Sequence, residues 1–220
     1  MEFYCYKEKL KEPANLNVKM IKNLQEQAAY IKNNFADANV SDTITFDNLI
    51  IYVAPKKINE FLQFLRDDKN LSFKVLIDLF GADLLGIREP RFEVIYNLLS
   101  LKLNNRITVK VVLNDGEEVP TAVPTFSAAG WFEREAFDMY GIVFTNHHDL
   151  RRILTDYEFE GHPLRKDFPL TGYKEVRYDE DQKKVIYEPV KLMQEFRNFD
   201  FEMPWEGTQY AISKDDKLNK

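Results

Sequence analysis

The sequence predicts an α+β fold: a two-layer domain of helices packed on a mostly antiparallel or mixed sheet, followed by a long extended C-terminal tail. Three observations support this prediction. Apolar residues three or four positions apart, the spacing of one helix face, occur in three separate segments. Before the third of these segments, apolar and polar residues alternate, as in strands with one buried face. After Pro189 the chain is rich in aromatic residues but shows neither period.

The first helix is expected at residues 15–35, with Asn15 or Asn17 as its N-cap, because an Asn side chain accepts a hydrogen bond from the first backbone N–H groups. Two β-rich runs then flank Asp47-Asn48, a pair that tolerates the positive φ of a hairpin turn. Pro55 favours the first turn of a second helix. The apolar face of that helix consists of Ile58, Phe61, Leu62 and Leu65.

An antiparallel meander is expected next. Alternation predicts three strands, at residues 71–79, 92–98 and 107–113. In the first of them, Leu76 and Phe80 also allow a short helical turn. Asn104-Asn105 divides the last two strands, and Gly116 marks the following turn.

The third helix is expected to start near Thr125, with Thr125 or Ser127 as its cap, and to end at Gly141 in the left-handed conformation. Its apolar face consists of Phe132, Ala136 and Met139 or Tyr140. Its other face carries Glu133, Arg134, Glu135 and Asp138. This second face is expected to be solvated or to make contacts, with Arg134 and Asp138 as an i,i+4 pair.

The chain is therefore expected to comprise an N-terminal extension at residues 1–14, an α+β core domain at 15–172, and a C-terminal region at 173–220. The last region is expected to begin with a small hairpin, formed by residues 173–179 and 185–188, and to continue as a tail.

Bulk properties exclude several classes of protein. The net charge of −6 and the pI near 5.3 argue against a nucleic-acid-binding protein. Apolar runs fall short of the ~18 residues of a membrane span, and the N-terminus is too polar for a secretory signal and too acidic for a mitochondrial presequence. The mature chain is therefore expected to begin near Met1. Cys5 is the only cysteine, which excludes an internal disulfide, a self-contained iron–sulfur cluster and a cysteine-based zinc site.

Residues 131–170 contain all three histidines and several arginines. His147 and His148 are adjacent and rarely bind one ion together, and zinc-site spacings are missing from the sequence. The chain also has no nucleophile elbow and no glycine-rich phosphate loop. Arginines beside carboxylates can instead form bidentate pairs, within the chain or across an interface. The pattern therefore favours contact over catalysis, with no catalytic, cofactor-binding or metal-binding residue in this chain.

The tail supplies an independent reason to expect a protein partner, because disordered tails are depleted in aromatic residues. The residues expected to form the partner interface or its structural framework are Trp131, Glu133, Arg134, Glu135, Asp138, Tyr140, Gly141, Asp149, Arg151, Arg152, Gly161, His162, Pro163, Arg165, Lys166, Asp167, Phe168 and Pro169, together with Phe196, Phe199, Phe201 and Trp205 in the tail.

Four stretches of the chain resemble a known family, the thirty-kilodalton subunit of respiratory Complex I, whose bacterial counterpart is the C subunit of NADH:quinone oxidoreductase. They are WFEREAFDMYGI, DLRRIL, EGHPLRKDFPL and the tail sequence EPVKLMQEFRNFDF, and the tail resembles the mitochondrial and alphaproteobacterial branch. Residues 146–150 depart from the family, which usually has Gly-His-Pro-Asp-Leu where this chain has Asn-His-His-Asp-Leu.

The resemblance implies a two-layer α+β subunit without flavin or cluster. It implies that FMN and iron–sulfur clusters lie in neighbouring subunits, and that the chain packs against the quinone-proximal forty-nine-kilodalton subunit and neighbouring iron–sulfur subunits, with its tail over them. The expected place is the matrix side of the mitochondrial inner membrane, or the cytoplasmic face of a bacterial one. Two alternatives are a homologous subunit of a ferredoxin-dependent dehydrogenase or membrane-bound hydrogenase, and a free-standing enzyme that uses His147, His162 and the arginines.

Overall fold

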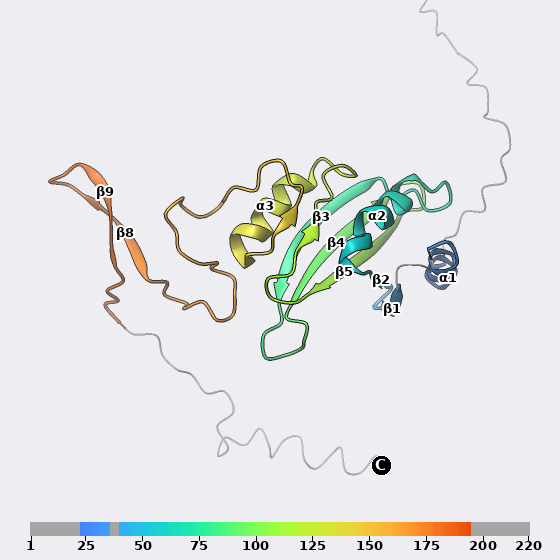
Figure 1. Ribbon diagram of the computed structural model, residues 1–220, viewed down its shortest axis with the longest axis horizontal. Coiled ribbons are helices and arrows are strands. Elements are labelled where there is room, and N and C mark those ends of the chain that lie inside the picture. The colour runs from blue at the N-terminus through green and yellow to red at the C-terminus, as the bar shows by residue number, and fades with distance from the viewer. Residues whose placement is uncertain (1–22, 36–39, 195–220) are drawn as a thin grey trace, which may run out of the picture. The chain divides into compact units, whose positions relative to one another are not determined.

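The computed structural model describes residues 23–35 and 40–194 (Figure 1). The chain divides into two compact units, Met1–Leu170 and Thr171–Lys220. In chain order the elements are α1 (Leu24–Asn34), β1 (Ser41–Thr45), β2 (Asn48–Tyr52), the 3-10 helix η2 (Pro55–Lys57), α2 (Ile58–Asp67), β3 (Val75–Asp83), β4 (Phe92–Ser100), β5 (Asn105–Leu113), β6 (Val119–Pro120), α3 (Ala129–Tyr140), β7 (Phe144–Thr145), β8 (Lys174–Asp179) and β9 (Lys184–Pro189).

Five strands of the first unit form one mixed sheet in the order β1-β2-β5-β4-β3. Strand β2 runs parallel to β5, and the other neighbouring pairs are antiparallel. The parallel pair arises because the chain leaves β2 through α2, forms β3 and β4, and returns to the middle of the sheet as β5. The predicted mixed, mostly antiparallel sheet is confirmed.

One apolar cluster holds the three helices against this sheet. Alternate residues of the strands enter the cluster, among them Tyr96 of β4 and Val109 of β5. Ile31 of α1, Leu62 of α2 and Ala136 of α3 join the same cluster. Burial of such side chains is the main favourable term in folding. The predicted packing of helices on a sheet is therefore confirmed for the described part of the chain.

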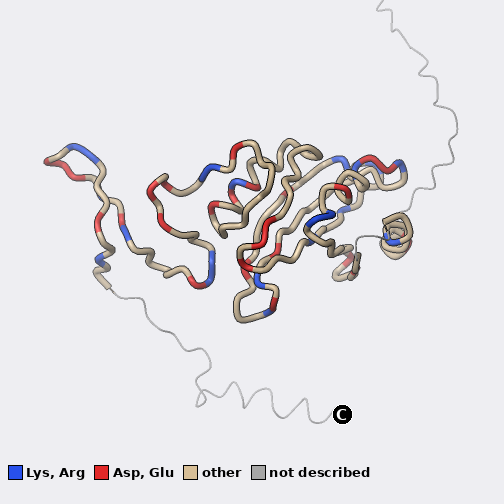
Figure 2. The backbone as a smooth tube through the Cα atoms, in the orientation of Figure 1, with Lys and Arg blue, Asp and Glu red and all other residues tan. Residues whose placement is uncertain are grey.

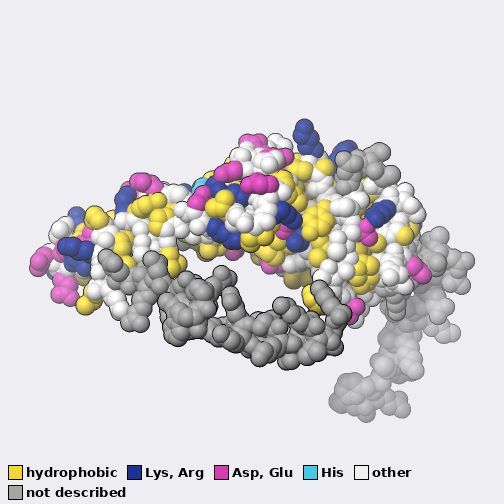
Figure 3. Space-filling model, turned by 90° about the horizontal axis from the view of Figure 1, so that it is seen from below, with side chains coloured by type: hydrophobic (Ala, Val, Ile, Leu, Met, Phe, Trp, Pro, Cys, Tyr) yellow, Lys and Arg dark blue, Asp and Glu magenta, His cyan; other side chains and the backbone are white. Residues whose placement is uncertain are grey.

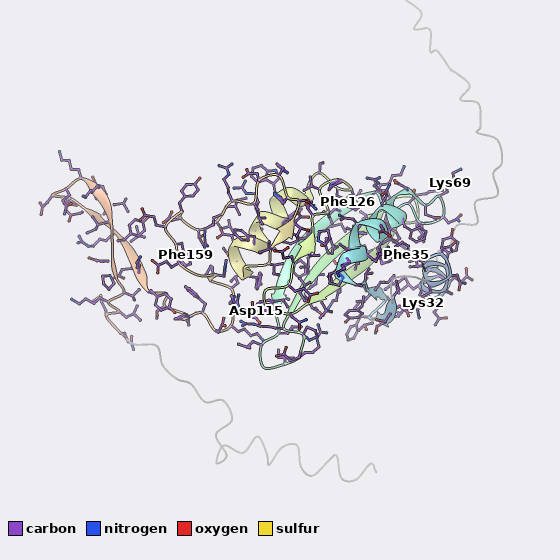
Figure 4. The ribbon with its side chains drawn as sticks, viewed as in Figure 1. Lys32, Phe35, Lys69, Asp115, Phe126 and Phe159 are labelled. Carbon is purple, nitrogen blue, oxygen red and sulfur yellow. The ribbon has the colours of Figure 1, made fainter. Side chains whose placement is uncertain are left out.

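The end of α1 is held against α2 by aromatic rings. Phe35, labelled in Figure 4, packs edge-on against Phe61, with 5.1 Å between ring centroids, and stacks on Phe64 at 5.7 Å. The four residues expected on the apolar face of α2 are all buried. The predicted second helix is therefore confirmed, with Pro55 in the 3-10 turn before it.

Helix α1 has a side-chain cap at its N-terminus. Its N-cap is Asn23, which has an extended backbone and a side chain that accepts a hydrogen bond from the Gln25 N–H at 2.9 Å. Asn15 and Asn17, the expected caps, lie outside the described residues. The described helix therefore starts at Leu24, and residues 15–22 of the predicted helix lie outside the described residues.

The predicted β1–β2 hairpin is confirmed, but its turn lies one residue earlier than expected. Phe46 and Asp47, with φ of 47° and 60°, form the turn. Asn48 belongs to β2 and donates a side-chain hydrogen bond to the Thr108 hydroxyl at 2.9 Å. The cross-strand bond holds Asn48 in the sheet, which is why it is not a turn residue.

Strand β3 covers Val75–Asp83 and not the predicted residues 71–79. Leu71 and Phe73 are buried, but they lie in a loop that follows α2, and the Phe73 N–H donates to the Leu65 carbonyl at 2.9 Å. The alternation of apolar and polar residues at 71–74 therefore reflects which side chains are buried, and these residues do not pair as a strand. Pairing with β4 extends the strand to Asp83 instead.

Helix α3 ends as predicted, with Gly141 in the left-handed conformation at φ 78°. It begins at Ala129 without a side-chain cap, so the expected cap at Thr125 or Ser127 is wrong. Backbone turns replace the cap: the Thr125 N–H donates to the Ala122 carbonyl at 2.9 Å just before the helix.

The described part of the second unit contains the antiparallel hairpin of β8 and β9, which confirms the predicted small hairpin. The tail beyond it, at residues 195–220, lies outside the described residues.

Candidate functional site

Helix α3 packs against the edge strand β3 and is also covered by the irregular segment at residues 146–170, called here the covering segment (Figure 1). Glu133 and Asp138 are both fully buried. Asp138 binds the covering segment, whereas Glu133 binds Thr121 and Ala122, which precede the helix. Of the two possibilities, solvation and contact, contact is the one observed for these two residues, because residues before and after the helix cover its second side. Glu135, from the same predicted face, is exposed.

Asp138 organises the first part of the covering segment. Its Oδ2 atom accepts hydrogen bonds from the backbone N–H groups of Ile153, Leu154 and Thr155 at 3.0, 2.7 and 2.9 Å. Its Oδ1 atom accepts from the Thr155 hydroxyl at 2.5 Å and from Arg152 at 2.8 Å. Burial acts to raise the pKa of Asp138, but these donors outweigh burial and hold the pKa well below its usual range. Asp138 is therefore an ionised group that shapes a loop.

Arg134 contacts the same loop with its donors. Its Nε and Nη2 atoms donate to the carbonyl oxygens of Arg151 and Arg152, both at 2.9 Å. Its guanidinium also lies 5.3 Å from the centre of the Trp131 ring. The expected i,i+4 pair of Arg134 with Asp138 does not form, because both side chains bind the covering segment instead.

Glu133 links α3 to the end of β6. Its two carboxyl oxygens accept hydrogen bonds from the Thr121 hydroxyl at 2.5 Å and from the Ala122 N–H at 2.6 Å. Burial raises the pKa of Glu133 to about 7, although both hydrogen bonds act to lower it. The carboxyl group is therefore a buried titratable group that packs inside the fold.

His147 lies beside Glu133 as a hydrogen-bonding group. Its Nδ1 accepts from the Asp149 N–H at 3.0 Å, so the ring proton of this tautomer is on Nε2. Nε2 then donates to the Gly130 carbonyl at 3.1 Å and lies 3.8 Å from Glu133 Oε2. Both ring nitrogens are thus directed at groups of the chain itself.

The turn before His147, where the chain departs from the family that it resembles, is formed by an asparagine. Asn146 adopts φ 62°, a left-handed conformation that Asn tolerates better than other side chains. His148 then stacks on His147, with 4.8 Å between the ring centroids. The departure at residues 146–150 therefore keeps a tight turn.

The Gly-His-Pro-Leu sequence of the covering segment closes the C-terminal end of α3. His162 donates from Nδ1 to the Asp138 carbonyl at 3.0 Å, and the Leu164 N–H donates to the Met139 carbonyl at 3.0 Å. The last carbonyls of a helix have no partner inside it, so these bonds satisfy them. The fit is close: a Cβ added at Gly141 would lie 2.7 Å from Nε2 of His162.

A second network anchors the Arg-Lys-Asp sequence of the covering segment. Arg91 binds both carboxylate oxygens of Asp83, at 2.9 and 2.7 Å, and donates to Asp167 at 3.0 Å. Asp83 also accepts from the Lys166 N–H at 2.8 Å. The Arg91 guanidinium holds the pKa of Asp83 well below its usual range. The covering segment is therefore pinned to the β3–β4 hairpin.

The arginines form bidentate or mixed pairs inside the chain. Arg165 pairs with Asp115, labelled in Figure 4, at 2.5 Å, and its guanidinium lies 5.0 Å from the centre of the Phe92 ring. Arg151 pairs with Asp149 through two hydrogen bonds of 2.6 and 2.8 Å at the surface. Of the two possibilities that the sequence leaves open, pairing within the chain is the one observed for these residues.

The remaining predicted residues complete the packing. A Cβ at Gly161 would lie 2.9 Å from the Phe168 ring, and that ring lies 5.7 Å from Phe159. Pro163 and Pro169 are partly buried in the same segment. Tyr140 is also partly buried; its ring lies against Gly81 of β3, where a Cβ would be 2.7 Å away. The tail residues expected at the interface lie outside the described residues; they are Phe196, Phe199, Phe201 and Trp205.

Apolar side chains of the same region face solvent. Those of Trp131, Leu154, Tyr157, Leu164 and Leu170 are between 52% and 84% exposed. Figure 3 shows apolar side chains interspersed with charged ones on the face that it draws. Aromatic side chains such as those of Trp131 and Tyr157 are enriched at protein interfaces. These five residues are called the exposed apolar set below.

Polar groups of the region bind one another within the chain. Among residues 23–35 and 40–194, no group of three or more His, Cys, Asp or Glu side chains is placed to hold a metal ion. Within those same ranges, no helix has the length and apolar character needed to cross a membrane. Lys and Arg alternate with Asp and Glu along the described backbone, and no continuous basic stripe forms there (Figure 2).

Sequence reasoning missed the partners of the covering segment. Asp83, Arg91 and Asp115 bind the Arg-Lys-Asp sequence, and Thr121 binds Glu133. For Asp83 a signal existed, because a carboxylate that interrupts an apolar run needs a partner when the run is buried. The other three carry no such signal, since the groups that they bind in the covering segment or in α3 are more than ten positions away.

Comparison with known proteins gives the family. Residues 51–174 match the family described as the respiratory-chain NADH dehydrogenase, 30 Kd subunit. The chain is 54% identical over 194 residues to the C subunit of NADH-quinone oxidoreductase from Methylobacterium sp. (strain 4-46), covering 88% of this chain and 90% of that protein. It is 52% identical over 201 residues to the corresponding protein of Agrobacterium fabrum, covering 91% and 100%.

A solved structure has the same fold. A chain of the membrane-bound sulfane sulfur reductase, an archaeal respiratory membrane complex, matches with a TM-score of 0.57 and 25% identity, covering 74% of this chain and 98% of that one. The chain therefore belongs to the 30-kDa subunit family of the respiratory-chain NADH dehydrogenase, and it is of the type found as the C subunit in alphaproteobacteria.

Proposed function

We propose that this chain is a non-catalytic, architectural subunit in the peripheral arm of the proton-translocating NADH:quinone oxidoreductase. One observation carries the proposal: the polar groups of residues 131–170 bind one another, whereas the exposed apolar set faces solvent. A catalytic site needs polar groups directed at a substrate, and a docking site needs apolar area. The geometry therefore favours docking over a free-standing enzyme, and 54% identity to a relative from this oxidoreductase favours this complex over related hydrogenase-type complexes.

The proposed partners are the quinone-proximal forty-nine-kilodalton subunit and neighbouring iron–sulfur subunits. In this proposal the chain carries no cofactor, and FMN and the iron–sulfur clusters lie in other subunits. Membership of the 30-kDa subunit family supports this placement of the cofactors in other subunits. The chain would support electron transfer from NADH to quinone by holding cofactor-bearing subunits in place, with the predicted framework residues shaping the surface.

We also propose that the C-terminal region, at residues 173–220, binds partner subunits. In the β8–β9 hairpin, Val176 lies opposite Tyr187 and Tyr178 opposite Val185, so four apolar side chains share one face. Each is about half exposed, between 49% and 57%. A two-stranded hairpin is marginally stable by itself in water, so a covering surface would stabilise it. The aromatic residues of the tail are a further reason to expect that this region binds a partner subunit.

The proposed location is the matrix side of the mitochondrial inner membrane, or the cytoplasmic face of a bacterial inner membrane. The subunit would be peripheral there, held by other subunits. The close bacterial relatives and the family support a membrane-associated respiratory complex as its setting.

Docking is tested by removing apolar area and leaving the polar networks intact. Replacing Trp131 and Tyr157 together by alanine is expected to lower the amount of assembled complex about ten-fold or more, because exposed aromatic side chains are the usual anchors of interfaces. The measurement is the amount of complex on native gels of membranes from cells that carry only the variant chain. Glu26→Ala, which changes an exposed side chain on α1 outside the predicted interface set, should leave that amount unchanged. Normal assembly of the Trp131→Ala/Tyr157→Ala variant would reject this surface as a docking site.

A further inference from the structure

The β1–β2 hairpin has a turn whose two central residues both adopt left-handed backbone conformations. Phe46 has φ 47° and Asp47 has φ 60°. Thr45 pairs with Asn48 across the turn, so the loop has two residues. Turns of this kind favour Asn-Gly, because Asn tolerates positive φ and Gly has no Cβ. A bulky phenylalanine in this conformation is strained.

The strained residue contributes nothing to the core of the chain. The Phe46 side chain is 100% exposed, and Ile44, two positions earlier, is 40% exposed. Asn or Gly at position 46 would adopt the backbone conformation of the turn with less strain and would expose less apolar surface to water. A large ring that is unfavourable for the fold of the chain itself therefore points to a use outside the chain.

We propose that Phe46 is an anchor residue that inserts into an apolar pocket on a neighbouring protein subunit. The proposal rests on the proposed function in one respect, namely that the chain works within a complex of different subunits. Rigid aromatic side chains are typical anchors, because they bury much area and lose little conformational entropy. The two-residue turn places the ring at the end of a hydrogen-bonded ribbon, which fixes its position before binding.

A second copy of this chain is a weaker candidate for the occupant. A phenylalanine side chain buries about 150–250 Å², whereas a stable interface buries about 1,200–2,000 Å² in total. Contact through this tip alone would therefore not hold two copies together. In a complex of different subunits, other surfaces hold the chain and the tip adds to them.

Two variants separate the ring from the strain. Phe46→Asn relieves the strain and removes the ring, whereas Asp47→Gly relieves strain in the same turn and keeps the ring. Both are expected to raise the thermal unfolding midpoint of the isolated full-length chain by about 2 °C or more. Only Phe46→Asn is expected to impair binding. A purely structural role for Phe46 cannot produce a gain of stability together with a loss of binding.

Binding is measured by competition inside one cell. Tagged wild-type and variant chains are co-expressed, and their ratio in the purified complex is compared with their ratio in the lysate. The ratio of Phe46→Asn to wild type is expected to be about ten-fold lower in the complex than in the lysate. For Asp47→Gly the two ratios should be equal. Below, the share of a variant means its ratio to wild type in the complex relative to that in the lysate. Equal incorporation of Phe46→Asn overturns the proposal. A dimer of the isolated wild-type chain that Phe46→Asn abolishes also overturns it, because the ring would then belong to a contact between copies.

The same competition includes the Trp131→Ala/Tyr157→Ala variant, so that the two proposals can fail separately. If that variant loses its share and Phe46→Asn does not, the anchor is wrong and the docking surface at α3 stands. If Phe46→Asn loses its share and the double variant does not, the anchor stands and that docking surface is wrong.

Discussion

Replacing Asp138 by alanine is expected to lower the free energy of unfolding by about 3–5 kcal/mol. The fully buried carboxylate accepts three backbone hydrogen bonds and pairs with Arg152. Its removal leaves three N–H groups and one guanidinium without their acceptor, and each of these groups is costly to keep away from water. The measurement is chemical denaturation of the isolated full-length chain, followed by circular dichroism.

Asp149→Ala is the matched control for this prediction. Asp149 is also a carboxylate that pairs with an arginine of the covering segment, but that pair is exposed to solvent. Surface ion pairs contribute little to stability, so the denaturation midpoint should hardly move. A similar midpoint for Asp138→Ala and the wild type would show that Asp138 does not organise the covering segment.

The second large effect concerns pH. The pKa of Glu133 is about 7 in the folded chain, above its ordinary value of 4.5, because the carboxyl group is buried. The folded chain therefore binds this proton more tightly than the unfolded chain does. The resulting stability is fully present below pH 4.5 and is lost as the pH rises through about 7, and it amounts to at most ~3 kcal/mol.

Glu133→Gln is expected to remove this pH dependence. Glutamine has the same shape, and its side chain can still accept from the Ala122 N–H and donate to Thr121. The variant should match the wild type at pH 5 and exceed it in free energy of unfolding by about 1–3 kcal/mol at pH 8. Asp83 and Asp138, whose pKa values are depressed, lose their contributions only in strong acid and do not disturb this range. Equal pH slopes for variant and wild type would contradict a titrating Glu133.

The sequence predicted the elements well because each carries its own local pattern. Helix α2 has a clear apolar face, and Gly141 marks the end of α3 because only glycine adopts its conformation without strain. Boundaries that depend on distant pairing were missed. Strand β3 ends at Asp83 because Phe92 pairs with it, and no local pattern contains that information.

The composition of the sequence located the candidate site, but the hydrogen bonds within the site could not be predicted from it. Asp138 and Glu133 look like surface residues because helical periodicity describes only one buried side. Asp138 is covered by a segment without regular secondary structure, and Glu133 is covered by the residues that follow β6. The bonds of Asp138 to the N–H groups of residues 153–155 depend on the path of that loop, which local propensity does not determine.

In the proposed function, residues 131–170 position other groups and perform no chemistry. The most direct test is NADH:quinone turnover per FMN in complex that carries His147→Gln together with His162→Asn. These amides keep the donors that reach the carbonyls of Gly130 and Asp138, and they remove both imidazoles as acids or bases. Turnover per FMN is expected to stay within about two-fold of the wild type, because general acid–base groups contribute about 10²–10⁴-fold and none is lost. A normal amount of complex with turnover reduced a hundred-fold or more would contradict the claim.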